Sequence, residues 1–222
     1  MDWTALSVSL RLAFGTCLLL IPFGLWLGRT LASRDFRGKA FCEALVALPL
    51  VMPPTVLGFY LMQSFGSDAP FGALWHRLFG DGLNFTFNGI LVASLLANLP
   101  FAVQPIQRAF ESVPGNLREA AWCSGLSPWQ TLLRIELPLV WPGIVSAMAL
   151  TFAHTLGEFG VILMVGGSID GETRTLAIAI YDRVQAFDEQ GAGIMSAMLL
   201  ALSFMTIGVV YGLAGRRRWR HV

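Results

Sequence analysis

The sequence predicts an all-α fold: a polytopic membrane helical bundle of about five transmembrane helices with a cytoplasmic helix-hinge-helix loop. Three observations predict it. Of 222 residues, 55% are hydrophobic and 13% are charged, whereas a soluble domain carries about 25% charged residues. Several apolar stretches reach the length of about 20 residues that a helix needs to cross a bilayer. Lys and Arg gather in alternate connections between these stretches, as they do in membrane proteins of fixed orientation.

Five stretches are expected to span the membrane, each with some tilt, as parts of one domain over residues 1–222. Their bounds are Ala5–Leu31, Ala40–Ser64, Phe87–Gln107, Leu139–Val165 and Ala192–Ala214. Residues 66–86, rich in Gly, Asp and Asn, are expected to form an ordinary external connection. No internal repeat or low-complexity linker divides the chain.

The basic residues predict an N-terminus outside and a C-terminus in the cytoplasm. Eleven Lys and Arg residues fall on one side of the five spans and three on the other, and the richer side should be cytoplasmic. The richer side holds the first loop, the loop between the third and fourth spans, and the tail up to Arg220. The other side holds Arg77, Arg174 and Arg183.

The residue inventory excludes several functions. The one lysine, Lys39, is not in a G-x-x-x-x-G-K-[ST] phosphate loop, so the chain is not expected to be an enzyme that hydrolyses ATP. Cys17, Cys42 and Cys123 are isolated from one another and from any Cys/His cluster, which predicts no metal site and no cofactor. No nucleic acid partner is expected.

A polar segment at about 109–138 lies between very apolar runs and has helix signals on both sides of a glycine. Ser112 and Pro114 can open a first helix. Gly125 suits its stop because glycine takes positive φ without strain. Residues 127–130, Ser-Pro-Trp-Gln, have the pattern of a capping box, and Pro138 is expected to end the second helix.

This hinged segment is suited to docking against a partner. Ala120 and Ala121 are small, so a partner backbone can approach closely. Glu119 offers a carboxylate near the start of the helix, where it complements the helix dipole. The alternative is an interfacial helix that only anchors the fold.

Polar side chains at membrane depth are costly and usually functional. Glu158 and His154 are four residues apart and share a helix face. Glu158 either lines or gates a pathway, or ties helices together through a partner such as His154; we favour the second, because a bare carboxylate repels an anion. Thr55 and Asn98, beside prolines that break their spans, can offer neutral donors to an oxyanion, although kinks for tight packing explain these breaks equally well.

The connection before the last span carries one candidate for an external contact. Arg174 either meets a docking partner or an anion, or forms a solvated salt bridge. Beyond it, Leu176, Ile180, Val184 and Phe187 recur at helical spacing and predict an amphipathic external helix.

Four segments together resemble the permease subunits of bacterial molybdate ABC transporters, whose group includes sulfate/thiosulfate and tungstate permeases. The first is similar to the E-A-A-x-x-x-G-x9-I-x-L-P signature of ABC importer permeases. Its matching residues are Glu119, Ala120, Ala121, Gly125, Ile135, Leu137 and Pro138. The other segments are the proline-rich run Pro49–Gly58, then Gly157–Gly160 and Gly171–Thr175. The short length and five spans fit the molybdate type better.

The resemblance implies an ABC importer type I permease fold in the bacterial inner membrane. It further implies that two copies form the pore, that a separate ATPase binds the 109–138 loop, and that a periplasmic binding protein delivers an oxyanion, with membrane lipid around the spans. Molybdate is the expected substrate, with sulfate, thiosulfate or tungstate as alternatives. The competing class is a secondary transporter or channel without an ATPase; such proteins often have inverted repeats, which are not evident in the sequence.

Overall fold

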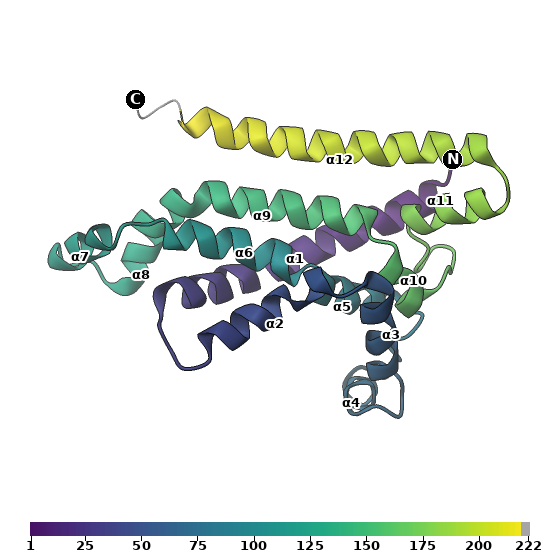
Figure 1. Ribbon diagram of the computed structural model, residues 1–222, viewed down its shortest axis with the longest axis horizontal. Coiled ribbons are helices and arrows are strands. Elements are labelled where there is room, and N and C mark those ends of the chain that lie inside the picture. The colour runs from purple at the N-terminus through teal and green to yellow at the C-terminus, as the bar shows by residue number, and fades with distance from the viewer. Residues whose placement is uncertain (219–222) are drawn as a thin grey trace.

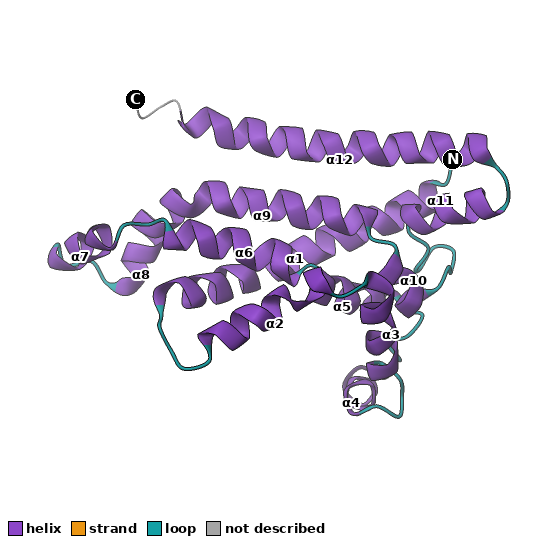
Figure 2. Cartoon of the chain, in the orientation of Figure 1, coloured by secondary structure: helices purple, strands orange, loops and turns teal. Residues whose placement is uncertain are grey.

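The computed structural model describes residues 1–218, and Figure 2 shows helices and connecting loops with no strand in that part of the chain. Arg220 of the basic tail lies outside the described residues. The helices are α1 (Trp3–Ser33), α2 (Lys39–Val51), α3 (Pro54–Ser64), α4 (Pro70–Phe79), α5 (Phe87–Ala97), α6 (Leu99–Glu111), α7 (Gly115–Cys123), α8 (Pro128–Thr131), the π-helical turn η1 (Leu132–Glu136), α9 (Leu137–Gly157), α10 (Gly160–Gly166), α11 (Leu176–Gln185) and α12 (Glu189–Arg218).

The long helices run side by side and form the bundle (Figure 1). α1 packs on α6 and α9, and α12 packs on α9. Buried apolar side chains, including Leu20, Ile106, Phe110 and Ile144, fill the centre. The N-terminus lies beside α11, whereas α12 ends toward α7 and α8, so the two ends of the described chain lie at opposite ends of the bundle.

The all-α class and the approximate number of spans are confirmed. Within the described residues, four helical segments are long and apolar enough to cross a membrane, namely Trp3–Ser33, Phe87–Glu111, Pro128–Gly157 and Glu189–Gly208. The pair of α2 and α3 makes a fifth if it is counted as one broken span, because the two helices are bent by 112°. A helix is also present where the sequence predicted an amphipathic one, as α11, although Phe187 lies beyond its end.

Two predicted spans are not continuous. The span Ala40–Ser64 breaks at Met52, whose backbone is extended (φ −75°, ψ 136°), because a proline disfavours helical geometry in the residue before it. The span Leu139–Val165 breaks where α9 ends at Gly157, and Glu158 is likewise extended. The helices that follow the two breaks, α3 and α10, pack together.

Glycine permits this packing of α3 on α10. A Cβ at Gly58 would lie 2.7 Å from the Cβ of Met164, and one at Gly160 would lie 2.9 Å from the Cβ of Pro54. The two backbones therefore approach more closely than residues with side chains allow.

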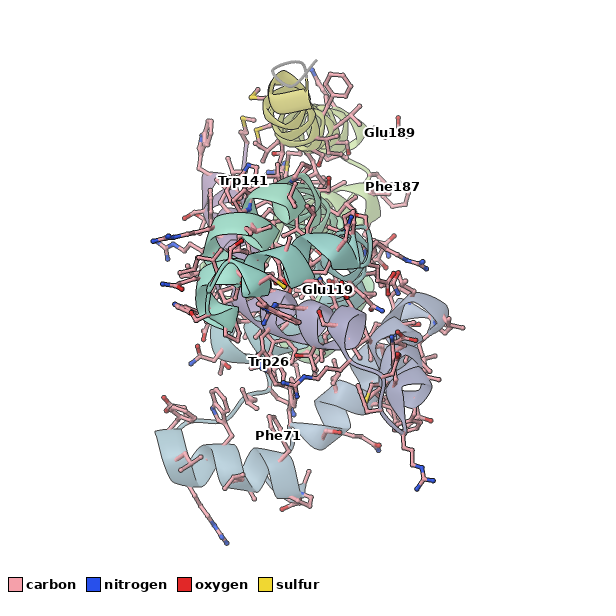
Figure 3. The ribbon with its side chains drawn as sticks, turned by 90° about the vertical axis from the view of Figure 1, so that its left-hand side faces the viewer. Trp26, Phe71, Glu119, Trp141, Phe187 and Glu189 are labelled. Carbon is pink, nitrogen blue, oxygen red and sulfur yellow. The ribbon has the colours of Figure 1, made fainter. Side chains whose placement is uncertain are left out.

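The connection over residues 66–86 contains helix α4, so the expectation of an ordinary loop was wrong. Pro70 occupies the first turn of α4, and Gly80 caps its end with a φ of +83°, an arrangement that is common at helix ends. Figure 3 shows Phe71 of α4 apart from the main bundle.

Candidate functional site

A cavity of about 610 Å³ lies where the two broken spans meet. It is bordered by the ends of α2 and α9 and by the beginnings of α3 and α10. Most of its wall is apolar, and its polar side chains are those of Thr55, His154 and Glu158. The beginning of α3 also borders this cavity, but Pro53 and Pro54 have no N–H. The N–H groups of Val56 and Leu57 donate to the carbonyl of Pro53 at 2.9 and 3.0 Å, so Thr55 supplies the remaining N–H of this first turn.

Asn98 joins the polar residues of the cavity to the bundle. This side chain is fully buried. Its Oδ1 lies 3.0 Å from His154 Nδ1, and its Nδ2 donates to Glu158 Oε2 at 3.3 Å. Asn98 Nδ2 also donates to the carbonyl of Ser94 at 2.9 Å, and the Ser94 hydroxyl accepts from Thr16 of α1 at 3.1 Å. The network therefore links α1, α5 and α9.

Glu158 both lines the cavity and is tied to its neighbours. Its side chain is 4% exposed, and its carboxylate lies 3.9 Å from His154, its one ion-pair partner among the described residues. The imidazole of His154 in turn stacks on Phe101, with ring centroids 4.1 Å apart. The four residues that the sequence singled out within the spans, Thr55, Asn98, His154 and Glu158, thus lie in or beside one cavity.

The hinged loop forms at the opposite end of α9, as the sequence predicts. α7 ends before Gly125, whose φ is +81°, and the N–H of Leu126 donates back to the carbonyl of Ala121 at 3.1 Å, a common helix-ending hydrogen bond. The predicted capping box is present. The N–H of Gln130 donates to the Ser127 hydroxyl at 3.3 Å, and the N–H of Ser127 donates to the Gln130 side chain at 2.9 Å.

Two details of the loop differ from the expectation. Pro138 does not end a helix, because α8 continues through η1 into α9 without a break and Pro138 lies directly after the π-helical turn. Ala121 is 4% exposed, so its small side chain serves packing within the chain and does not face a partner. Glu119 and Ala120 are exposed, and Figure 3, viewed toward the α7 end, labels Glu119.

Sequence reasoning missed two groups of residues in this loop. Trp122 and Trp129 are 55% and 66% exposed, and two tryptophans in a polar segment were the available signal. Glu136 is a buried carboxylate that contacts both Arg29 and Arg118. Its signal was an acidic residue in a largely apolar run.

Arg174 forms ion pairs at the other end of the bundle. Its Nη1 lies 3.4 Å from Asp2 Oδ2, and its Nε lies 3.2 Å from Asp182 Oδ2. These contacts join the start of the chain, the segment before α11, and α11 itself. The geometry therefore favours the salt-bridge alternative for Arg174.

Comparison with known proteins defines the class to which this architecture belongs. Residues 21–220 match the family described as binding-protein-dependent transport system inner membrane component. The chain belongs to this family, and it is a transport component of the inner membrane.

Individual relatives indicate which members of this family the chain resembles. The molybdenum transport system permease protein ModB of Azotobacter vinelandii is 42% identical over 214 residues, which cover 95% of this chain and 93% of that protein. A probable sulfate transport system permease protein, cysT of Chlorella vulgaris, is 30% identical over 204 residues, covering 92% and 76%. The resemblance to the molybdate permease group is thus confirmed.

A solved structure supports the fold independently. A chain from a bacterial ABC transporter that imports the acidic polysaccharide alginate superimposes with a TM-score of 0.78 over 96% of this chain and 78% of that chain. The two sequences are 17% identical, so this likeness concerns the fold alone.

Proposed function

We propose that this chain is the pore subunit of an ATP-driven molybdate importer that works with a separate ATPase and a periplasmic binding protein. The observation that carries the proposal is the pairing of two features on one helix. The hinged loop precedes α9, and the polar cavity lies where α9 ends. A single rigid element therefore connects a docking surface at one end of the bundle to a pathway within it.

The loop over about 109–138 is the proposed ATPase-coupling loop. Glu119, Ala120, Trp122 and Trp129 present its exposed surface, and tryptophan is enriched among the residues that dominate binding at interfaces. Gly125 sets the angle between α7 and α8. The loop continues directly into α9 through Ile135, Leu137 and Pro138, so the loop and α9 are proposed to move together. ATP is hydrolysed by the partner, since this chain has no phosphate loop.

The cavity is the proposed section of the transport pathway, and a second copy of the chain completes it. Leu50 and Val51, at the end of α2 beside the cavity, are 50% and 81% exposed, which leaves an apolar surface for that copy to cover. The hydroxyl and the backbone N–H of Thr55, in the first turn of α3, are the proposed neutral donors to an oxyanion. Asn98, His154 and Glu158 hold the wall in place.

Molybdate is proposed as the substrate because the molybdenum transport relative is 42% identical, against 30% for the sulfate relative. Both ions are tetrahedral dianions, so neutral donors in the cavity distinguish them weakly. Discrimination is assigned to the binding protein, whose docked surface the permease contacts. Sulfate remains the second candidate on the basis of the weaker relative.

The proposed orientation places α7 in the cytoplasm and Arg174 outside. Arg29, Arg118 and Arg134 gather at the α7 end, as the positive-inside rule requires. Two proteins with a single cysteine each test this orientation. One carries Ser67→Cys with all native cysteines replaced by serine, and it should react with an impermeant thiol reagent in intact cells. The other keeps only the exposed native Cys123, which should react only after the cells are opened. Labelling of Cys123 in intact cells would contradict the proposed orientation and would place α7 outside the cell.

The experiment that tests the proposed function is purification of the tagged chain from its native membrane. An ATPase subunit should co-purify in a fixed ratio, and the purified complex should hydrolyse ATP faster when the molybdate-loaded binding protein is added. A chain that transports without any associated ATPase would instead be a secondary transporter, and the proposal would fail.

A further inference from the structure

Glu136 is a charged residue in a position where charge is costly. It lies at the end of η1, its side chain is 2% exposed, and it precedes the membrane-spanning helix α9. A buried carboxylate is stable only when it is paired with opposite charge or with hydrogen-bond donors. Two arginines from different parts of the chain supply this opposite charge.

Each oxygen of Glu136 is held by a different arginine. Arg29 Nε donates to Oε2 at 2.7 Å, and Arg29 lies near the end of α1, 107 residues earlier in the chain. Arg118 Nε lies 2.7 Å from Oε1 as an ion pair, and Arg118 belongs to α7. The side chains of Arg29 and Arg118 are 36% and 19% exposed. We call these three residues the arginine clamp.

Apart from the clamp, α7 is weakly attached to the bundle. Ala121 is its one buried residue, so few apolar contacts hold the helix in place. Arg118 adds a second tie, because its Nη2 donates to the carbonyl of Phe110 near the end of α6 at 3.3 Å. α1, by contrast, packs firmly against α6 and α9. Contact between α7 and the membrane-spanning bundle therefore depends heavily on the charge of Glu136.

The local backbone explains how Glu136 reaches both partners. η1 is a π-helical turn between α8 and α9. A π turn adds a residue to the helix and changes the direction of the side chains that follow it, and such turns are frequent at functional sites. Glu136 ends this turn and is held by Arg29 on one side and Arg118 on the other.

We propose that Glu136 is a positioning residue that transmits movement of the ATPase-docking helix α7 to α1 through Arg118 and Arg29. The inference rests on the proposed function, since it presupposes that an ATPase moves α7. An ion pair suits this role because it holds two elements at a fixed separation without requiring an extended apolar interface. Breaking it leaves docking intact but separates ATP hydrolysis from transport.

The test uses the complete complex, with ATPase and binding protein, reconstituted in vesicles. The quantity measured is substrate uptake per ATP hydrolysed. For Glu136→Gln and for Arg29→Gln we expect the ATPase to bind in the normal ratio while uptake per ATP falls at least about fivefold, the lower end of typical coupling factors. Arg29 lies on α1 rather than on α7, so its effect cannot arise from lost ATPase contact at α7.

Two further variants sharpen the test. Arg34→Gln removes a positive charge from the same end of α1, at an exposed position that forms no ion pair with any described residue. It should leave uptake per ATP unchanged. Arg118→Lys keeps the charge beside Glu136 and should retain most of the coupling. If Glu136→Gln fails to reach the membrane, Arg29→Gln alone tests the proposal. In that variant the Glu136 carboxylate keeps Arg118 as an ion-pair partner, so we expect the protein to fold.

The outcomes separate the clamp from the proposed function. If Arg29→Gln has the uptake per ATP of the wild type, the proposed role of the arginine clamp is wrong. An equal loss of ATPase activity and uptake would also contradict it, because that result indicates a purely structural role. If no ATPase co-purifies with the wild-type chain, the proposed function itself is wrong.

Discussion

Glu158→Ala should leave little folded transporter in the membrane, whereas Glu158→Gln should be folded and should transport. Alanine removes one acceptor of the Asn98 amide and the neighbour of His154 in a nearly fully buried position, while Ser94 still accepts from that amide. A hydrogen bond to a carboxylate contributes about 1.5–3 kcal/mol, and the vacated volume adds to this loss. Together these losses are a large fraction of a typical stability of about 5–15 kcal/mol. Glutamine keeps both the shape and an acceptor oxygen.

The measurement is the amount and thermal stability of detergent-solubilised protein, followed by uptake in vesicles. Glu189→Ala is the matched control, because Glu189 is exposed at the beginning of α12 and its removal should cost only a few tenths of a kcal/mol, roughly the size of a helix-dipole contribution. A Glu158→Gln protein that is stable but inactive would show that transport needs the charge itself. Glu158 would then act on the pathway rather than only holding its wall.

Gly125→Val should abolish ATPase association and transport while leaving membrane insertion unchanged. The φ of +81° at Gly125 is a left-handed conformation that is strained for residues with a Cβ and most strained for β-branched ones. Nothing lies within 4 Å of a Cβ built there, so the effect comes from the backbone and not from a clash. Valine should therefore change the angle between α7 and α8 and displace the docking surface.

Gly125→Asn is the matched control, because asparagine tolerates the left-handed region. It should keep most of the ATPase association that valine destroys, measured as the ratio of ATPase to tagged chain after purification. Normal association of the Gly125→Val protein would mean that the angle of the hinge is not needed for docking.

Local signals in the sequence were sufficient for the elements that depend on local rules. Apolar length predicted the spans, and Gly125 and the Ser127–Gln130 capping box predicted the hinge with its helix boundaries. The same local reasoning misjudged Pro138, because a proline after a helical run is compatible both with the end of one helix and with the first turn of the next.

The remaining features depend on contacts that are distant in sequence. Pairing of Arg29 with Glu136 joins residues 107 positions apart, and no periodicity reveals it. Asn98 and Glu158 are 60 positions apart and lie on different predicted spans, so their contact depends on how those spans pack. Burial of Ala121 likewise depends on how α7 rests against its neighbours, which a helical pattern of nine residues does not fix.

The most direct test of the account measures uptake into vesicles that contain the purified permease, with and without its ATPase. Molybdate-loaded binding protein outside and ATP at the α7 side should together drive molybdate uptake, and uptake should stop when either the ATPase or ATP is left out. Sulfate-loaded sulfate-binding protein should give no uptake. Uptake that continues without the ATPase would contradict the assignment of residues 109–138 as a coupling loop and, with it, the central claim.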